Sequence, residues 1–158
     1  MAKYRKVSTK IWNDEKFRAL SDDGKLLFFF LLTHPHMTAL GAMRTSLAGL
    51  AAELGWPHGR LSKAFAEASG KGIACLDERA HCIFLPNFLK HNLPESPNVI
   101  KAWAAGLEDI PECELKTLAF QKAKSVSDTL SEAFREAFRS LPEALSKGMP
   151  NQEQELKQ

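Results

Sequence analysis

The sequence predicts a mainly α-helical fold that carries one small β-hairpin. Apolar residues recur at helical spacing in several segments that proline or glycine separates, and two short apolar runs flank a charged four-residue loop. The 158 residues are 44% hydrophobic and 25% charged, which is ordinary for a folded domain. The longest strictly apolar run, Leu26–Leu32, has seven residues. A membrane span needs about 20, so we expect no membrane segment.

The first helical region begins after a basic arm. Residues 3–12 mix β-favouring and basic side chains, which predicts an extended arm or an edge strand, and a short helical turn should follow over 14–20. Ser21 is a predicted N-cap for a helix over 22–33. That helix is apolar nearly all round, so we expect it at the buried centre, and Pro35 ends it.

A pair of helices is predicted next. A short strand over 39–45 contains Gly41, which permits a close backbone approach or a bulge. Ser46 should cap one helix, which Gly55 ends, and a second should run over 57–69. The expected buried faces are Leu47, Leu50, Ala51 and Leu54 in the first helix, and Leu61, Ala64, Phe65 and Ala68 in the second.

A hairpin closes this part of the chain. The apolar runs 73–76 and 81–85 flank the charged residues 77–80, which predicts two antiparallel strands with a four-residue loop. The order helix, strand, helix, turn, helix, hairpin is that of a winged helix, so we predict a winged helix-turn-helix DNA-binding domain over 1–92.

Beyond this domain, two prolines within 93–98 predict a linker. A helical C-terminal segment is expected over 99–147, and the polar residues 148–158 should form a disordered tail. Three cysteines without a framework spacing favour a reduced chain in the cytoplasm.

The predicted DNA contacts follow from the helix-turn-helix geometry, in which the second helix of the pair enters the major groove. Arg60 can offer two donors to guanine, whereas Lys63 should contact phosphate. Arg79 is the cation of the hairpin loop. The candidate DNA-binding residues are Lys3, Arg5, Lys6, Arg44, His58, Arg60, Lys63 and Arg79. The first three lie in the arm, which would either pair as a strand with Arg5 facing solvent or stay free to enter a minor groove.

Charge is distributed unevenly along the chain. Residues 1–92 contain 13 basic and 8 acidic side chains, a net charge of +5, whereas residues 93–158 contain 8 and 11, a net charge of −3. This asymmetry favours a polyanion as the partner of the first part only.

Several ordered blocks resemble a known family. They are Lys10–Arg18, Leu20–Phe28, Leu40-Gly41, Leu50–Trp56 and Pro86–Lys90, and they look like the N-terminal region of phage and prophage replication proteins of the replisome-organiser or replication-initiator type. The resemblance covers roughly residues 3–98, and residues 148–154 are similar to the tails of such proteins. It implies a winged-helix module that binds duplex DNA at an origin, followed by a segment that contacts helicase, helicase loader or primase.

The C-terminal segment contains a repeated Glu-Ala-Phe-Arg sequence that places Phe134 and Phe138 on one helical face. With Trp103 and Leu130 they would either complete an internal core or form a partner-binding or homodimer helix.

We predict no enzyme, no cofactor and no metal site. The sequence has no Gly-rich phosphate loop and no H-E-x-x-H motif, and Cys75 and Cys82 lack the paired spacing of structural zinc. Trp12 could stack on single-stranded bases, but its place before a helix start favours a core position. A DNA-binding protein of phage replication is therefore the leading hypothesis. The alternatives are a winged-helix transcription regulator and a phage-encoded inhibitor that binds protein only.

Overall fold

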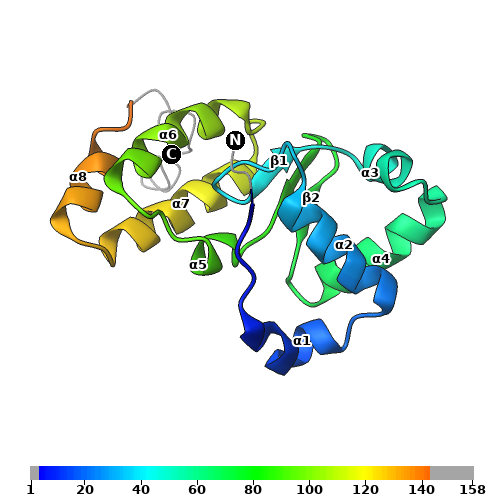
Figure 1. Cartoon of the computed structure of the whole chain (residues 1–158). Coiled ribbons are helices and arrows are strands. Elements are labelled where there is room, and N and C mark those ends of the chain that lie inside the picture. Colours follow the sequence, from blue (N-terminus) through cyan, green and yellow to red (C-terminus); the bar gives the residue numbers. More distant parts are fainter. Residues whose placement is uncertain (1–3, 143–158) are drawn as a thin grey trace, which may run out of the picture.

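The computed structural model describes residues 4–142, which form a mainly helical fold around a small three-stranded antiparallel sheet (Figure 1). The elements are η1 (Thr9–Asn13), α1 (Glu15–Arg18), α2 (Asp22–Thr33), β1 (Ala42–Arg44), α3 (Leu47–Leu54), α4 (His58–Gly70), β2 (Cys75–Asp77), β3 (Cys82–Phe84), α5 (Phe88–His91), α6 (Pro97–Asp109), α7 (Glu114–Asp128) and α8 (Glu132–Arg139). Within this part of the chain, no helix is long and apolar enough to cross a membrane.

The sheet has the order β1-β3-β2, with both pairs antiparallel. Ile83 of the central strand lies opposite Met43 on one side and Leu76 on the other. The hairpin is therefore confirmed, but its strands are shorter than predicted and one end is shifted. His81 adopts a φ of +56°, which belongs to a turn, and the Asp77 carboxylate accepts a hydrogen bond from the Ala80 N–H at 3.0 Å.

The local signals around the helix pair are confirmed. Ser21 and Ser46 cap α2 and α3, each accepting a hydrogen bond from the backbone N–H three residues ahead, and Gly55 ends α3 in the left-handed region. Gly41 has a φ of +84°, and a Cβ there would lie only 2.4 Å from the Cβ of Phe88. The predicted close approach is thus between the start of β1 and α5.

The expectation that α2 is buried all round is wrong. Leu27 and Leu31 are fully buried, but Leu26 on the same helix is 48% exposed. The reason is that α4 packs on one side of α2, whereas the opposite side faces the surface. Of the two predicted alternatives, an extended arm or an edge strand, the edge strand is absent: residues 4–8 have no regular secondary structure, and η1 follows them.

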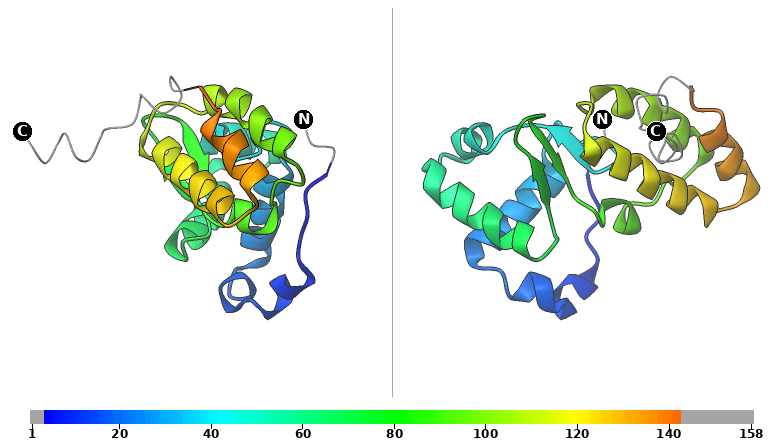
Figure 2. Two further views of the ribbon diagram at one scale, coloured as in Figure 1. Left: turned by 90° about the vertical axis from the view of Figure 1, so that its left-hand side faces the viewer. Right: turned by 180° about the vertical axis from the view of Figure 1, so that it is seen from behind.

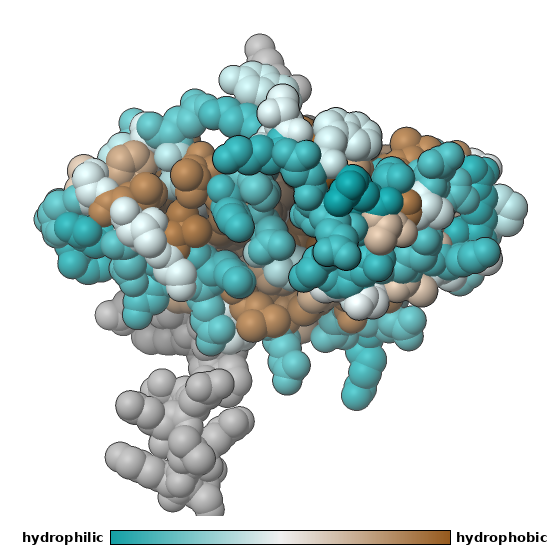
Figure 3. Space-filling view, turned by 90° about the horizontal axis from the view of Figure 1, so that it is seen from below, coloured by the Kyte–Doolittle hydropathy of each residue, from teal (hydrophilic) through white to brown (hydrophobic). Residues whose placement is uncertain are grey.

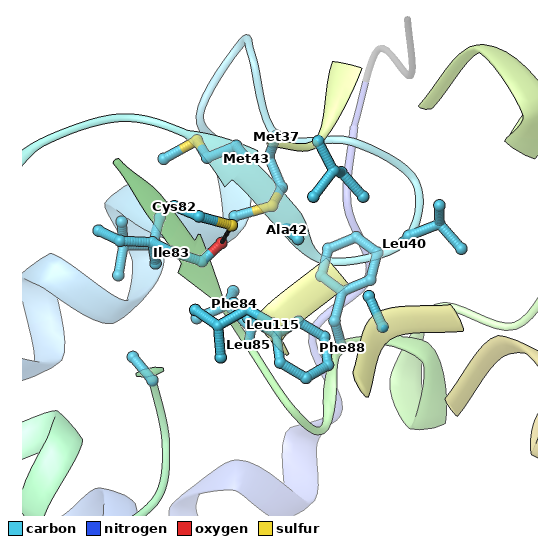
Figure 4. Packing of buried hydrophobic residues seen from close by; sticks show 14 of the residues in the cluster. Met37, Leu40, Ala42, Met43, Cys82, Ile83, Phe84, Leu85, Phe88 and Leu115 are labelled. Atoms are coloured by element: carbon cyan, nitrogen blue, oxygen red, sulfur yellow. Dashed lines mark hydrogen bonds between the residues drawn. The ribbon is translucent and has the colours of Figure 1, made fainter. Parts of the chain in front are cut away.

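The C-terminal helices pack against the sheet through α7, which contacts all three strands and α5. Figures 1 and 2 show α6, α7 and α8 gathered on one side of the sheet, with α3 and α4 on the other. Side chains of both parts of the chain belong to one hydrophobic cluster, in which Leu115 of α7 lies beside Phe84 and Phe88 (Figure 4). The predicted linker is shorter than 93–98, because Pro97 is already the first residue of α6.

Candidate functional site

The predicted recognition helix is α4. Its buried face, which includes Leu61 and Phe65, packs towards α2 and α3. Lys63 lies on the opposite, exposed face, and His58 is exposed at the start of the helix. The sequence-predicted pattern of one apolar and one polar face is therefore confirmed, and the exposed face offers a lysine near its centre.

The exposed side chain of Arg60 is bonded to another residue of the chain. Its Nε and Nη2 donate to the two carboxylate oxygens of Asp23, each at 2.9 Å, and the guanidinium lies 4.1 Å from the centre of the Trp56 ring. The hydrogen bond from Arg60 lowers the pKa of the Asp23 carboxyl, and the same bond raises the pKa of Arg60. The Arg60 donors predicted to bind guanine are thus bonded to the Asp23 carboxylate, and this ion pair links α4 to the start of α2.

Glu67 makes a second tie of the same kind. Its carboxylate accepts hydrogen bonds from the backbone N–H of Ser21 at 3.1 Å and from the Ser21 hydroxyl at 2.6 Å. Sequence reasoning missed this role of Glu67. Arg60 and Glu67 are seven residues apart on one helical face, but no local pattern indicates that Ser21 and Asp23 lie opposite them.

The hairpin turn and the end of β1 meet at one end of the sheet. Arg44 lies opposite Cys82 in the strand register, and the Thr45 N–H donates to the His81 carbonyl at 2.8 Å. Arg79 is exposed in the turn. Among residues 4–142, neither Arg44 nor Arg79 nor Lys63 forms an ion pair, so their charges are available to a partner.

The N-terminal arm is anchored, which neither sequence alternative anticipated. The Arg5 Nη2 donates to the Met37 carbonyl at 2.7 Å, and the guanidinium lies 5.5 Å from the centre of the Phe88 ring. Burial lowers the pKa of Arg5, and its Nε is buried without a hydrogen-bond partner in the described part of the chain. The expectation that Arg5 faces solvent or lies in a free arm is therefore wrong, because its side chain turns inward.

Lys6 extends this attachment. Its backbone N–H donates to the Asn92 side-chain oxygen at 3.1 Å, and its Nζ lies 3.0 Å from the Glu95 carboxylate. The hydrogen bond to Glu95 raises the pKa of Lys6. Lys3, the other predicted cation of the arm, lies outside the described residues.

A cleft of about 580 Å³ separates the arm and η1 from α5. Its apolar lining includes Phe17, Phe28, Leu32, Ile73 and Phe88, and its cationic lining is Lys6, Lys10 and Lys90. The face that contains α1 and α5, seen from below in Figure 3, is hollowed, with hydrophobic atoms in the hollow and hydrophilic side chains around it. No residue pattern in the sequence indicates this cleft, because its walls come from segments far apart along the chain.

Of the two alternatives for the C-terminal segment, the structure has the internal core. Trp103 is 1% exposed and Phe138 is 9% exposed, and their ring centres are 6.5 Å apart. Phe120 lies 5.2 Å from Phe138 on its other side. Leu130 and Phe134 are half-buried. The partner-binding prediction needs correction for Trp103 and Phe138, because the packing of α8 on α6 and α7 encloses both.

In the described residues, no three His, Cys, Asp or Glu side chains are grouped to hold a metal ion. His34 is buried, and its Nε2 lies 2.6 Å from a Glu53 oxygen. Its Nδ1 accepts a hydrogen bond from the His36 N–H at 3.1 Å. Both ring nitrogens are thus engaged within the protein.

Comparisons with known proteins give no relative: no family model, no curated protein and no solved structure matches the chain.

Proposed function

We propose that the chain is a DNA-binding protein of phage replication that contacts duplex DNA through α4 and the β2–β3 turn. One observation carries the proposal. Along the chain, α3 and α4 follow β1 and precede the β2–β3 hairpin. That hairpin pairs with β1 in the sheet order β1-β3-β2. This element order is what a winged helix would have, and in a winged helix the second helix of the pair would dock in the major groove.

The cations on this part of the surface support contact with phosphates more than the reading of bases. These cations are Lys63, which is exposed on α4, and Arg44 and Arg79, which lie at the turn end of the sheet. Arg60, the residue best suited to guanine, is bonded to Asp23. We therefore propose binding that is strongly salt-dependent and only weakly selective for sequence.

The role in replication rests on the resemblance of the ordered blocks within residues 3–98 to phage replication proteins. It extends the proposal to recruitment of a helicase, a helicase loader or a primase, in the cytoplasm of the bacterial host. Because Trp103 and Phe138 are enclosed, recruitment or homodimer formation would use other residues, among which Phe134 and Leu130 retain partial exposure.

The test of duplex binding is a titration of labelled duplex at several salt concentrations. Replacing one phosphate-contacting lysine reduces the slope of log affinity against log salt by about one, so Lys63→Gln should do this for every duplex sequence. Lys122→Gln makes the same charge change on an exposed residue of α7 and should leave the slope unchanged. Equal slopes in the wild type and Lys63→Gln would place the duplex contact elsewhere.

A footprint on phage DNA then separates the two DNA-binding hypotheses. Protection at the replication origin supports the replication protein, whereas protection at a promoter supports the transcription regulator. A chain that binds no duplex at low salt would contradict both and leave the protein-binding inhibitor.

A further inference from the structure

Large exposed hydrophobic side chains are concentrated at the N-terminal arm. Tyr4 is 73% exposed, Val7 is 43% exposed and Trp12 is 59% exposed. Trp12 meets Phe17 edge to face, with the ring centres 5.4 Å apart and the planes at 74°. The expected core position of Trp12 is therefore wrong, since this one edge contact leaves most of the indole open to solvent.

The cleft beside η1 combines an apolar interior with cations. Lys10 comes from η1 itself, and Lys90 comes from α5 on the other side. The single carboxylate in the lining is Asp14, which accepts hydrogen bonds from the Lys16 and Phe17 N–H groups at the start of α1. Neither Lys10 nor Lys90 forms an ion pair within residues 4–142.

We propose that this cleft and the adjoining Trp12 bind single-stranded nucleic acid. Grooves of this kind join cations that follow the phosphates to aromatic rings on which bases stack, which is the combination that Lys10, Lys90 and Trp12 provide. A base stacks on the exposed indole, the phosphates lie against the two lysines, and the apolar interior around Phe28 receives a neighbouring base.

The anchoring of the N-terminal arm restrains the surface proposed to bind the single strand. Arg5 is fastened to the Met37 carbonyl, and the Lys6 backbone is fastened to Asn92. These bonds lie before η1, so they restrain the element that contributes Lys10 to the lining of the cleft and carries Trp12 next to Ile11 of that lining. A restrained wall loses less conformational entropy when the ligand binds.

The proposal concerns a different surface from the proposed duplex contact. In Figure 1, η1 and α1 lie at the bottom of the molecule, whereas α3 and α4 form its right-hand end. Charge decides between classes of partner: the cations favour a polyanion, and every nucleotide of a single strand supplies one phosphate beside one stackable base. An acidic amphipathic peptide is the other class, and the experiment distinguishes it.

The experiment measures anisotropy of a labelled oligo(dT) of about 16 nucleotides, which spans a typical groove and forms no duplex. Trp12→Leu keeps an apolar side chain but removes the stacking face, and it should weaken binding at least about fivefold, the lower end of the stacking range per base. Trp12→Phe should retain most of the affinity. Equal affinity of Trp12→Leu and the wild type would overturn the proposal.

The lysines provide a second test that does not alter Trp12. Each phosphate contact on a single strand contributes about 0.7 to the salt slope, so Lys10→Gln with Lys90→Gln should reduce it by about 1.4. Lys122→Gln with Lys124→Gln makes the same charge change on exposed residues of α7 and should leave the slope unchanged. The same loss in both double variants would overturn the proposal, as would an absence of oligo(dT) binding by the wild-type chain.

Two further measurements separate the alternatives. If a glutamate-rich amphipathic peptide binds and Trp12→Leu abolishes that binding but not the binding of oligo(dT), the cleft is a protein-docking site and the proposal is wrong. Duplex titrations of the same variants keep the two proposals apart: Lys63→Gln should affect duplex only, and the Trp12 variants should affect oligo(dT) only. Far-UV circular dichroism checks that each variant is folded.

Discussion

Arg60 and Asp23 form a bidentate ion pair that joins the first turn of α4 to the first turn of α2, with both N···O distances at 2.9 Å. Trp56 stacks on the same guanidinium from the turn before α4. Arg60, which the sequence alone predicts to contact DNA, thus holds α4 against α2 instead.

The first prediction concerns the titration of Asp23. Its hydrogen bond with Arg60 lowers the pKa below the ordinary 3.8, so the ion pair stabilises the fold above that pH and is lost as the pH falls through the lowered pKa. In Arg60→Gln, the carboxyl should titrate closer to 3.8. Carbon NMR of the Asp23 carboxyl measures both midpoints, and identical midpoints would show that the pair is not formed in solution.

The second prediction concerns the approach of β1 to α5. Gly41→Ala places a Cβ 2.4 Å from that of Phe88 at a φ of +84°, so overpacking adds to backbone strain. We expect a loss of about 3 kcal/mol in the free energy of unfolding, measured by urea denaturation. Gly55→Ala is the matched control. It has a φ of +70° with no atom within 4 Å of the new Cβ, and it should cost only about 1 kcal/mol. Equal losses would contradict the close approach.

The third prediction concerns the enclosed aromatic group of the C-terminal helices. Phe138→Ala removes a ring that contacts Trp103 and Phe120, and it should lower the free energy of unfolding by about 3 kcal/mol. Leu118→Ala alters a side chain of α7 that is 43% exposed, and it should change stability by less than about 0.5 kcal/mol. If Phe138→Ala instead leaves unfolding unchanged and abolishes self-association in sedimentation, Phe138 is an interface residue after all.

The fourth prediction concerns Cys82, which is fully buried in β3. Burial, with the neighbouring Cys113, raises the pKa of this thiol from 9.0 to about 12. The folded state therefore keeps a proton that the unfolded state loses, so the thiol's contribution is complete below 9.0 and declines as the pH rises from there towards about 12. The decline approaches about 1.4 kcal/mol per pH unit. Denaturation at pH values on either side of the ordinary thiol pKa should show a steeper loss for the wild type than for Cys82→Ala. Parallel losses would mean that the thiol is accessible to water.

Features that depend on neighbouring residues follow from the sequence by itself. The caps at Ser21 and Ser46 need only the N–H groups three residues ahead, and the end of α3 needs only the permissive φ of Gly55. The buried face of α4 follows from helical spacing, and the hairpin follows from two apolar runs around a charged loop. Their boundaries shifted by a residue or two where a turn, as at His81, took a residue from a strand.

The tertiary structure decided which partner each polar side chain has and which apolar side chains are buried. Arg60 donates to Asp23, 37 residues away in the sequence, and Arg5 donates to the Met37 carbonyl, 32 residues away. Trp103 is covered by α8. Trp12, which the sequence assigns to the core, remains exposed beside a cleft. Helical spacing specifies which face of an element is apolar, but the partner that covers a face, or leaves it open, depends on long-range packing of the whole chain. Local propensity carries no information about that packing.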